Sequence, residues 1–281
     1  MSASTAGVTG GDTVMIPVKL CNLPPFHPVA GKLLTLPGDM DDVKRVVSIV
    51  GGDPALAAEI LFVANSSLFG FPARIQSLRH AVAVLGLDCV RQLAMTVAVR
   101  SLARDAGPFV RASWCHSVAC AVIAEKIAAV FGSTAEQAYT AGLLHDVGRL
   151  GFLRTYPSEI GPVLAREYAD ASDAIAAERA VMNSSHGEAG AWLIEYWALP
   201  AALLETCARH HDPVEDHDSP LLQTVKTACQ LADATGYTPV RYTKRPEYEE
   251  VLLSAAPRHP ASFPDEATIR AEVEARLRAF D

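Results

Sequence analysis

Leu143-Leu144-His145-Asp146-Val147-Gly148-Arg149 is the stretch that decides how this 281-residue sequence is interpreted. It places an adjacent histidine and aspartate inside an apolar run that begins near Ala138. A neutral imidazole beside a carboxylate suits a hard-to-borderline divalent cation. The same pair also fits a buried histidine that is satisfied by its neighbouring carboxylate. The positions of the other histidines have to decide between these two interpretations.

The composition is that of an ordinary globular protein, because half of the residues are hydrophobic and Gly and Pro are moderate. The net charge is −8, with acidic and basic residues mixed along the chain. This balance argues against a nucleic-acid binder that relies on bulk attraction to phosphates. The six cysteines are scattered without a Cys-x-x-Cys motif, which indicates reduced, mostly buried thiols in a cytosolic protein.

Neither a secretory signal nor a membrane span is expected. The first dozen residues are small and polar, without the basic and apolar regions of a signal peptide. The apolar stretches are interrupted by charges or Gly before they reach the roughly 18 residues that a membrane span needs. We therefore expect a cytoplasmic protein with no membrane partner.

Helix start and stop signals recur along almost the whole chain. Residues 1–19 are expected to form a flexible leader, because the first fourteen are rich in Gly, Ser and Thr. Asp53-Pro54 places a capping residue before a proline at the first helical position. Ser77 opens a later helix that Gly86 closes, and no strand-type alternation runs long enough to compete with these helices. The predicted fold class is all-α.

Seven polar residues interrupt the apolar faces of the helices predicted in the second half of the chain. They are His116, His145, Asp146, His186, His210, His211 and Asp233. Each group lies on, or at the end of, a separate predicted helix. A helix bundle can point such side chains inward so that they converge, which is how helical bundles build metal sites. Imidazole nitrogens and carboxylate oxygens together suit Zn, Mn, Fe or Ni, and an aspartate can bridge two ions.

Each of these residues also has an ordinary structural interpretation. His116 fits an exposed face, His186 fits a first-turn surface position, and His210-His211 fits a helix C-terminus that favours cations. Asp233 fits a solvated turn before Gly236. The order along the chain favours a metal site nevertheless, because five of the nine histidines belong to this one pattern.

The order His…His-Asp…His…His-His…Asp resembles the HD superfamily of metal-dependent phosphohydrolases, and most closely its HDOD branch. Three stretches carry the likeness, which covers roughly residues 20–235. They are Asp53-Pro54-Ala55-Leu56 with Ala64-Asn65-Ser66-Ser67-Leu68-Phe69-Gly70; Ala81-Val82-Ala83-Val84-Leu85-Gly86; and the run from Trp114 and His116-Ser117 through Ala141-Gly142-Leu143-Leu144-His145-Asp146-Val147-Gly148 to His186, Trp197-Ala198-Leu199-Pro200 and His210-His211.

The HDOD resemblance implies a bacterial, all-α signalling domain of two packed helical subdomains, the C-terminal one an HD-type helical bundle. We accordingly expect an N-terminal helical subdomain at residues 20–105 and a metal-site bundle at 106–236. Residues 237–281 are expected to form an extension that ends in a helix.

The resemblance also implies a ligand set for one or two divalent ions of Fe, Mn, Zn or Ni. His116, His145, Asp146 and Asp233 would form one metal site. His186, His210 and His211 would complete a second, with Asp146 as the bridge. Many members of the family have lost metal ligands, whereas this chain keeps the full series.

Two departures separate the chain from the related HD-GYP phosphodiesterases. Arg149 stands where those enzymes carry a lysine after His-Asp-x-Gly, and no Gly-Tyr-Pro loop follows His210-His211. Hydrolysis of cyclic di-GMP is therefore not expected.

Two functions from different classes remain open. The favoured one is a regulatory module that acts through a signalling protein partner or a nucleotide ligand, since the substrate-loop motifs are missing. The alternative is an active metal-dependent phosphohydrolase for phosphomonoesters or phosphodiesters, with Asp146 on the metal and Arg149 holding the phosphate. A DNA-binding helix-turn-helix is least favoured, because the N-terminal half shows no basic recognition face. The sequence leaves homo-oligomerisation open.

Overall fold

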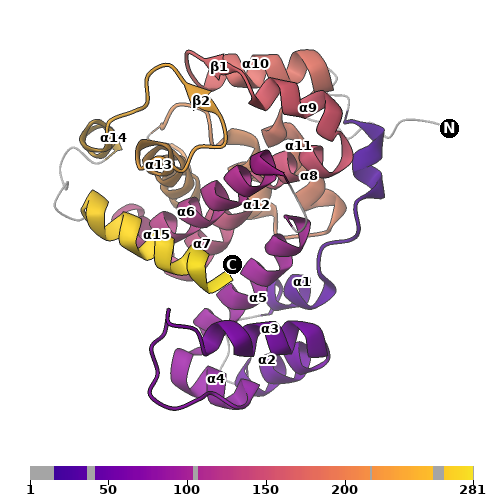
Figure 1. Ribbon diagram of the computed structural model, residues 1–281, viewed down its shortest axis with the longest axis vertical. Coiled ribbons are helices and arrows are strands. Elements are labelled where there is room, and N and C mark those ends of the chain that lie inside the picture. Colours follow the sequence, from indigo (N-terminus) through magenta and orange to yellow (C-terminus); the bar gives the residue numbers. More distant parts are fainter. Residues whose placement is uncertain (1–15, 37–41, 104–106, 216, 256–262, 281) are drawn as a thin grey trace. The chain divides into compact units, whose positions relative to one another are not determined.

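The structure is a computed structural model that describes residues 16–36, 42–103, 107–215, 217–255 and 263–280. Within these ranges the secondary structure is almost entirely helical (Figure 1), which confirms the all-α prediction. The chain forms two compact units, which we call the larger unit (residues 1–24 and 102–264) and the smaller unit (residues 25–101 and 265–281). Most of the predicted leader, residues 1–15, lies outside the described residues.

The smaller unit is a set of helices, and the sequence showed the start signals of two of them, α3 and α4. Its helices are α1 (Pro28–Leu34), α2 (Asp42–Gly51), α3 (Pro54–Ala64), α4 (Leu78–Leu85), α5 (Leu87–Leu102) and α15 (Glu266–Phe280). Asp53 accepts a hydrogen bond from the backbone N–H of Leu56, and Ser77 accepts one from that of His80. Both residues are therefore the N-caps that the sequence predicted. Helices α2, α3 and α4 pack against one another.

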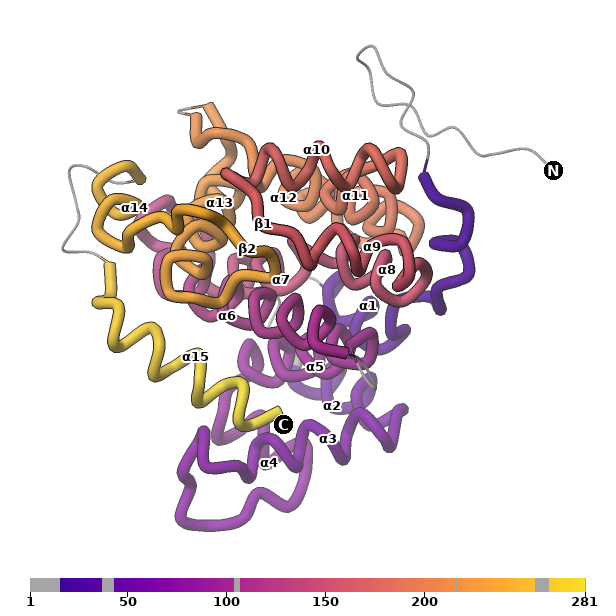
Figure 2. Tube along the Cα trace, turned by 45° about the horizontal axis from the view of Figure 1, so that its top comes forward, coloured from indigo at the N-terminus to yellow at the C-terminus, as the bar shows by residue number. Residues whose placement is uncertain are grey.

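The larger unit is a helical bundle with one very short parallel strand pair. Its elements are η1 (Val18–Asn22), α6 (Pro108–Phe131), α7 (Ala135–Leu144), α8 (Val147–Thr155), α9 (Pro157–Leu164), β1 (Glu167–Tyr168), α10 (Ala171–Met182), α11 (His186–Tyr196), α12 (Ala201–Arg209), α13 (Pro220–Ala234), β2 (Arg241–Tyr242) and α14 (Tyr248–Ala255). Helix α6 packs against α7 and α13, and α11 packs against α8 and α12 (Figure 2). Strands β1 and β2 pair in parallel. At two residues each, they are too short to produce an alternating pattern, so the sequence did not predict them.

Helix α6 corrects the expectation that no apolar stretch reaches membrane-spanning length. By length and composition this 24-residue helix could cross a membrane, and 67% of its qualifying window is buried inside the structure. Two bent pairs, α2 with α3 and α4 with α5, would also qualify if each pair counted as one span. The expectation was wrong because the charged residues of α6, which are Arg111, Glu125 and Lys126, lie toward its two ends and leave a predominantly apolar middle. An apolar helix of this kind also fits the core of a bundle.

Gly148 marks the place where α8 crosses α11 at very close range. A Cβ atom at position 148 would collide with the backbone oxygen of His186 and the backbone nitrogen of Gly190, and it would lie 2.9 Å from the Cα of Gly190. A change of side-chain rotamer cannot relieve a collision with backbone atoms. The absence of a side chain at Gly148 therefore lets the helix that follows His145-Asp146 touch the helix that begins at His186.

Gly148→Ala is expected to lower the free energy of unfolding by at least about 2 kcal/mol, since overpacking costs about 1–3 kcal/mol in close-packed interiors. The matched control is Gly51→Ala in α2, where an added Cβ would meet only Cδ1 of Leu78, at an ordinary contact distance of 3.8 Å. That substitution should be neutral or slightly stabilising, because alanine favours helix over glycine. Urea denaturation of both variants measures the difference. A Gly148→Ala protein as stable as the parent would contradict the close crossing.

Candidate metal centre

The ends and inner faces of six helices bring the predicted ligands into two neighbouring groups. We call the first the aspartate group and the second the thiol group. The aspartate group contains Asp146, His186, His210 and His211, and the thiol group contains His116, His145 and Cys229. Within each group, the candidate ligand atoms all lie within 4.8 Å of one another. Asp233 lies beside the thiol group, with its Oδ1 3.6 Å from Nδ1 of His116.

Helix termini explain why several of these side chains point inward. His145 is the C-cap of α7 and Asp146 is the N-cap of α8, so a break between two helices presents both. His186 is the first residue of α11, directly after the N-cap Ser185, which forms a capping box with Glu188. His210 is the C-cap of α12. These positions hold polar side chains at fixed points of the bundle without interrupting a helix.

In the thiol group, two histidines aim lone pairs at each other. Nδ1 of His116 lies 2.6 Å from the carbonyl oxygen of Tyr237, and Nδ1 of His145 lies 2.6 Å from that of Gly142. We assign the proton of each neutral ring to Nδ1, because a carbonyl oxygen can only accept. The two Nε2 atoms are then acceptors, yet they lie 3.2 Å apart. A cation between the rings resolves this conflict.

A proton on one ring is the other way to resolve the conflict, and burial opposes it. His145 is 0% exposed. Burial and the neighbouring histidines outweigh the attraction of Asp146 and hold the pKa of His145 well below its ordinary value. The neutral ring is the form that binds metals. The donor set therefore fits a metal ion better than a shared proton.

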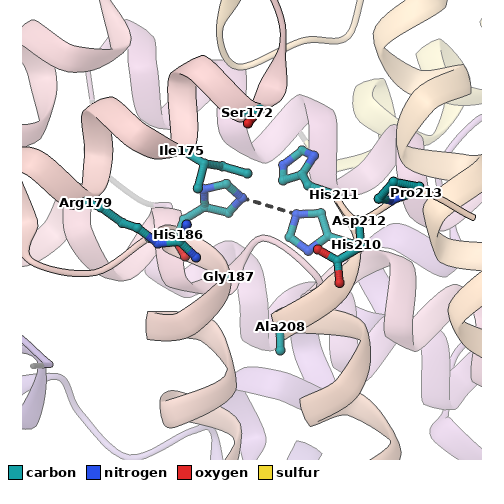
Figure 3. Close-up of a pocket in the computed structure, with 11 residues that line it drawn as sticks. Ser172, Ile175, Arg179, His186, Gly187, Ala208, His210, His211, Asp212 and Pro213 are labelled. Carbon is teal, nitrogen blue, oxygen red and sulfur yellow. Dashed lines mark hydrogen bonds between the residues drawn. The ribbon is translucent and has the colours of Figure 1, made fainter. Parts of the chain in front are cut away.

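The aspartate group repeats this arrangement around the carboxylate of Asp146, and Figure 3 shows its three histidines. His210 donates from Nδ1 to the carbonyl oxygen of Cys207 at 2.8 Å, and His186 donates from Nδ1 to Oε2 of Glu178 at 2.5 Å. The Nε2 atoms of these two rings lie 3.2 Å apart. Oδ1 of Asp146 lies 3.2 Å from Nε2 of His186 and 3.5 Å from Nε2 of His210.

Oδ1 of Asp146 is buried and accepts no hydrogen bond of acceptable geometry from the described residues. A buried carboxylate oxygen that faces two nitrogen lone pairs would be strongly unfavourable without a positive charge between them. Tetrahedral ligands at about 2.0–2.1 Å from one ion are separated by about 3.3 Å. The measured nitrogen–nitrogen and nitrogen–oxygen separations therefore fit a bound cation.

Arg149 and Glu178 hold the aspartate group in place through hydrogen bonds to Asp146 and His186. Arg149 donates from Nε to Oδ2 of Asp146 at 2.9 Å and from Nη1 to Oε1 of Glu178 at 2.6 Å. Its Nη2 lies 3.1 Å from both ring nitrogens of His186. Arg149 is only 2% exposed. Its predicted contact with a phosphate stays a prediction.

The charges around Arg149 keep both carboxylates ionised. Burial raises the pKa of Asp146, but Arg149 and His186 outweigh this and hold it well below its ordinary value. Burial likewise opposes ionisation of Glu178, but His186 and Arg149 lower its pKa to about 2. The centre therefore presents anionic oxygen at neutral pH, which favours the binding of a cation.

A cavity of about 370 Å³ opens onto the aspartate group. Figure 3 shows His186, His210 and His211 along it, together with Ser172 and Arg179. Its volume lies at the small end of the range for ligand pockets. Arg149 is not among its lining residues. A small ligand would therefore reach the histidines of the aspartate group from the side of α10.

All seven residues predicted from the sequence lie in or beside the two groups, although their role as ligands stays a prediction. Cys229 and Glu178 were not predicted. Cys229 lies four residues before Asp233 on α13, and this one-turn spacing was a signal that could have found it. Glu178 reaches His186 through the turn between α10 and α11, and no sequence pattern marks that contact.

Glu178→Gln is expected to weaken metal binding by about 10–100-fold, because partners that orient a metal-binding histidine contribute that much. The glutamine would remove the negative charge that accepts the Nδ1 proton of His186. Isothermal titration with Zn²⁺ and Mn²⁺ measures the change. The matched control is Glu59→Gln in the smaller unit, where the carboxylate pairs with Arg100 at 2.8 Å. Equal affinities in Glu178→Gln and the parent would show that Glu178 does not support the centre.

Comparisons with known proteins agree with this architecture. A family model described as "HDOD domain" matches residues 23–213, which is more than half of the chain. An HDOD domain protein of unknown function from Geobacter sulfurreducens has a similar solved structure. Its TM-score is 0.68 at 27% identity, over 94% of this chain and 91% of that one. A candidate phosphohydrolase from Shewanella amazonensis SB2B has a TM-score of 0.72 at 22% identity, over 94% and 97% of the two chains, which shows a shared fold.

A curated but uncharacterized protein of Treponema pallidum (strain Nichols) is 25% identical over 187 residues. The match covers 65% of this chain and 36% of that relative, so the chain spans about a third of the relative's length.

Proposed function

This chain belongs to the HDOD family, and on that premise we propose that it is a signal-transduction module with a divalent metal ion in its His/Asp centre. One observation carries the proposal. Oδ1 of Asp146 is buried without a hydrogen bond from the described residues and faces the Nε2 atoms of His186 and His210. A divalent ion would satisfy all three atoms together. We propose Fe, Mn, Zn or Ni, in one or two copies, as the ion.

The regulatory role is supported by the pairing of Arg149 and by the lack of a substrate-loop motif after the paired histidines. Arg149 is committed to two buried carboxylates, Asp146 and Glu178, and no Gly-Tyr-Pro loop follows His210-His211. We propose that the protein acts in the bacterial cytoplasm through a signalling protein partner or a nucleotide ligand, without nucleic acid or membrane. A homo-oligomer is compatible with this role.

A second candidate function is metal-dependent hydrolysis of a phosphomonoester or phosphodiester. It is favoured by the cavity that reaches His186, His210 and His211, with Arg179 in its lining. When bound, the metal would supply Lewis acidity and a lowered pKa for water. Asp146 and the histidines would hold the ion, and Arg179 would offer a positive charge to a phosphate that enters from the side of α10.

Elemental analysis of protein purified without added metal tests the metal centre. We expect at least about half an equivalent of a transition metal to remain bound, because structural and catalytic sites of this donor type bind tightly. A lower content, combined with no uptake of Zn²⁺, Mn²⁺, Fe²⁺ or Ni²⁺ during titration, would overturn the proposal.

A substrate screen separates the two candidate functions. Phosphomonoesters and phosphodiesters are tested with each of the four metals on the parent protein and on Asp146→Asn. The regulatory role predicts no turnover that depends on Asp146. Turnover that disappears in Asp146→Asn, while the circular dichroism spectrum is unchanged, would favour the phosphohydrolase.

A further inference from the structure

We propose that Cys229 is a thiolate ligand, so that the thiol group is a mixed imidazole–thiolate site that prefers Zn²⁺ or Fe²⁺ to Mn²⁺. The inference rests on the proposed function only in requiring that the centre binds metal. It concerns a residue that the His/Asp pattern does not contain. Soft sulfur ligands select these ions, whereas all-oxygen ligands suit Mn²⁺ and Mg²⁺.

Two distances in the thiol group match those of ligands around a single ion, and all three ligand atoms lie within 4.8 Å of one another. Sγ of Cys229 lies 3.6 Å from Nε2 of His116, and that atom lies 3.2 Å from Nε2 of His145. Zinc lies about 2.0–2.1 Å from nitrogen and about 2.3 Å from sulfur in tetrahedral sites, which separates nitrogen from sulfur by about 3.6 Å and nitrogen from nitrogen by about 3.3 Å. Both measured separations agree with these values.

A hydrogen bond from the thiol cannot explain the same geometry. If the S–H of Cys229 donated to Nε2 of His116, the lone pair of His145 would still face that nitrogen without a proton or a cation. The Nδ1 atoms of both rings are already committed to carbonyl oxygens. One cation that accepts from the sulfur and from both nitrogens satisfies the three atoms together.

Cys207 provides a comparison, because its thiol makes a purely structural contact in the same bundle. It is also buried, but its S–H donates to the carbonyl oxygen of Leu144 at 3.3 Å, and it belongs to neither ligand group among the described residues. Cys229 has a histidine nitrogen as its neighbour instead. Cys207 and Cys229 are therefore a matched pair of buried cysteines for experiment.

Asp233 lies outside the thiol group, whose ligand atoms on His116, His145 and Cys229 converge. Its Oδ1 is close to Nδ1 of His116, on the side of the ring away from Nε2, and Asp233 is not in the converging group. Cys229 lies one helical turn earlier on the same face of α13 and brings its sulfur to Nε2. Binding of the ion would break the S–H bond of Cys229, form a sulfur–metal bond and release one proton to solvent.

Cobalt(II) is the probe that tests this inference, because thiolate coordination produces an intense charge-transfer band in the near ultraviolet. The full-length protein is stripped with a chelator and titrated with Co²⁺. We expect the band in the parent and in Cys207→Ser, and we expect its loss in Cys229→Ser. We also expect Cys229→Ser to bind Zn²⁺ more than about 100-fold less tightly, which exceeds the loss caused by a supporting residue.

X-ray absorption of the zinc-loaded parent gives a second measurement that needs no variant. A sulfur scatterer at about 2.3 Å is expected, beside nitrogen or oxygen at about 2.0–2.1 Å. Bound metal without a sulfur scatterer, or a cobalt band that persists in folded Cys229→Ser, would overturn the role of Cys229 and leave the metal centre standing. No uptake of Co²⁺ or Zn²⁺ by the parent would overturn the metal centre, and this inference with it.

Discussion

Asp146→Asn is expected to strip the metal from the purified protein and to weaken its affinity for Zn²⁺ and Mn²⁺ by more than about 100-fold, beyond the 10–100-fold effect of a supporting residue. The reason is the position of the carboxylate. Oδ1 faces two histidine nitrogens, and Oδ2 accepts from Arg149. Asparagine keeps the shape but removes the negative charge, and it aims either a neutral oxygen or an N–H group at the ion.

Elemental analysis and calorimetric titration measure the effect of Asp146→Asn. Asp53→Asn is the control, because Asp53 lies in the smaller unit, outside the candidate ligand groups, where it caps α3 and pairs with His27 at 3.4 Å. We expect this control to keep its metal. Equal metal contents in Asp146→Asn and the parent would remove Asp146 from the ligand set.

Arg149→Met is expected to lower the free energy of unfolding of the metal-free protein by about 3–5 kcal/mol, the usual cost of removing one partner of a buried ion pair. Arg149 neutralises two carboxylates that are each about 1% exposed, Asp146 and Glu178. Without the guanidinium, both carboxylates must stay charged in a dry interior or take up protons. A divalent cation would replace part of the missing positive charge, so saturating Zn²⁺ should recover stability in the variant.

Urea denaturation with a chelator and with excess Zn²⁺ measures both parts of this prediction. Arg100→Met is the control, because Arg100 pairs with Glu59 in a partly exposed position, and its replacement should cost about 1 kcal/mol or less. Arg149→Lys should fall between the parent and Arg149→Met, since lysine keeps the charge but cannot donate to both carboxylates at once. A metal-free Arg149→Met protein as stable as the parent would contradict the account.

Local signals in the sequence predicted most of the helices because the residues that cap a helix lie next to it in the chain. Asp53, Ser77 and Ser185 each accept the expected hydrogen bond from a backbone N–H three residues ahead. Helix α9 was not predicted, because Gly161 and Pro162 lie inside it and both residues are typical of turns. Helix α14 lies in a Pro- and charge-rich stretch with mixed signals.

The candidate ligands were predictable for a different reason. Polar residues such as His116 and His145 stand out on predicted helices that are otherwise apolar. Cys229 did not stand out, because a buried cysteine behaves as a small apolar residue and is common in cores. Glu178 was not predicted for another reason, because a glutamate on a helix is ordinarily exposed. Its near-complete burial depends on Arg149, and only the tertiary structure reveals that partnership.

Because α8 and α11 cross in direct backbone contact, the main chain sets the separation between Asp146 and His186. Gly148 and Gly190 touch through backbone atoms, so no side chain acts as the spacer between the two helices. Apolar side chains around the crossing can therefore change in size and let the outer bundle adjust, while the two ligands keep their separation. We therefore expect the metal centre to tolerate substitutions in the surrounding core, whereas substitutions at Gly148 or Gly190 should disrupt it.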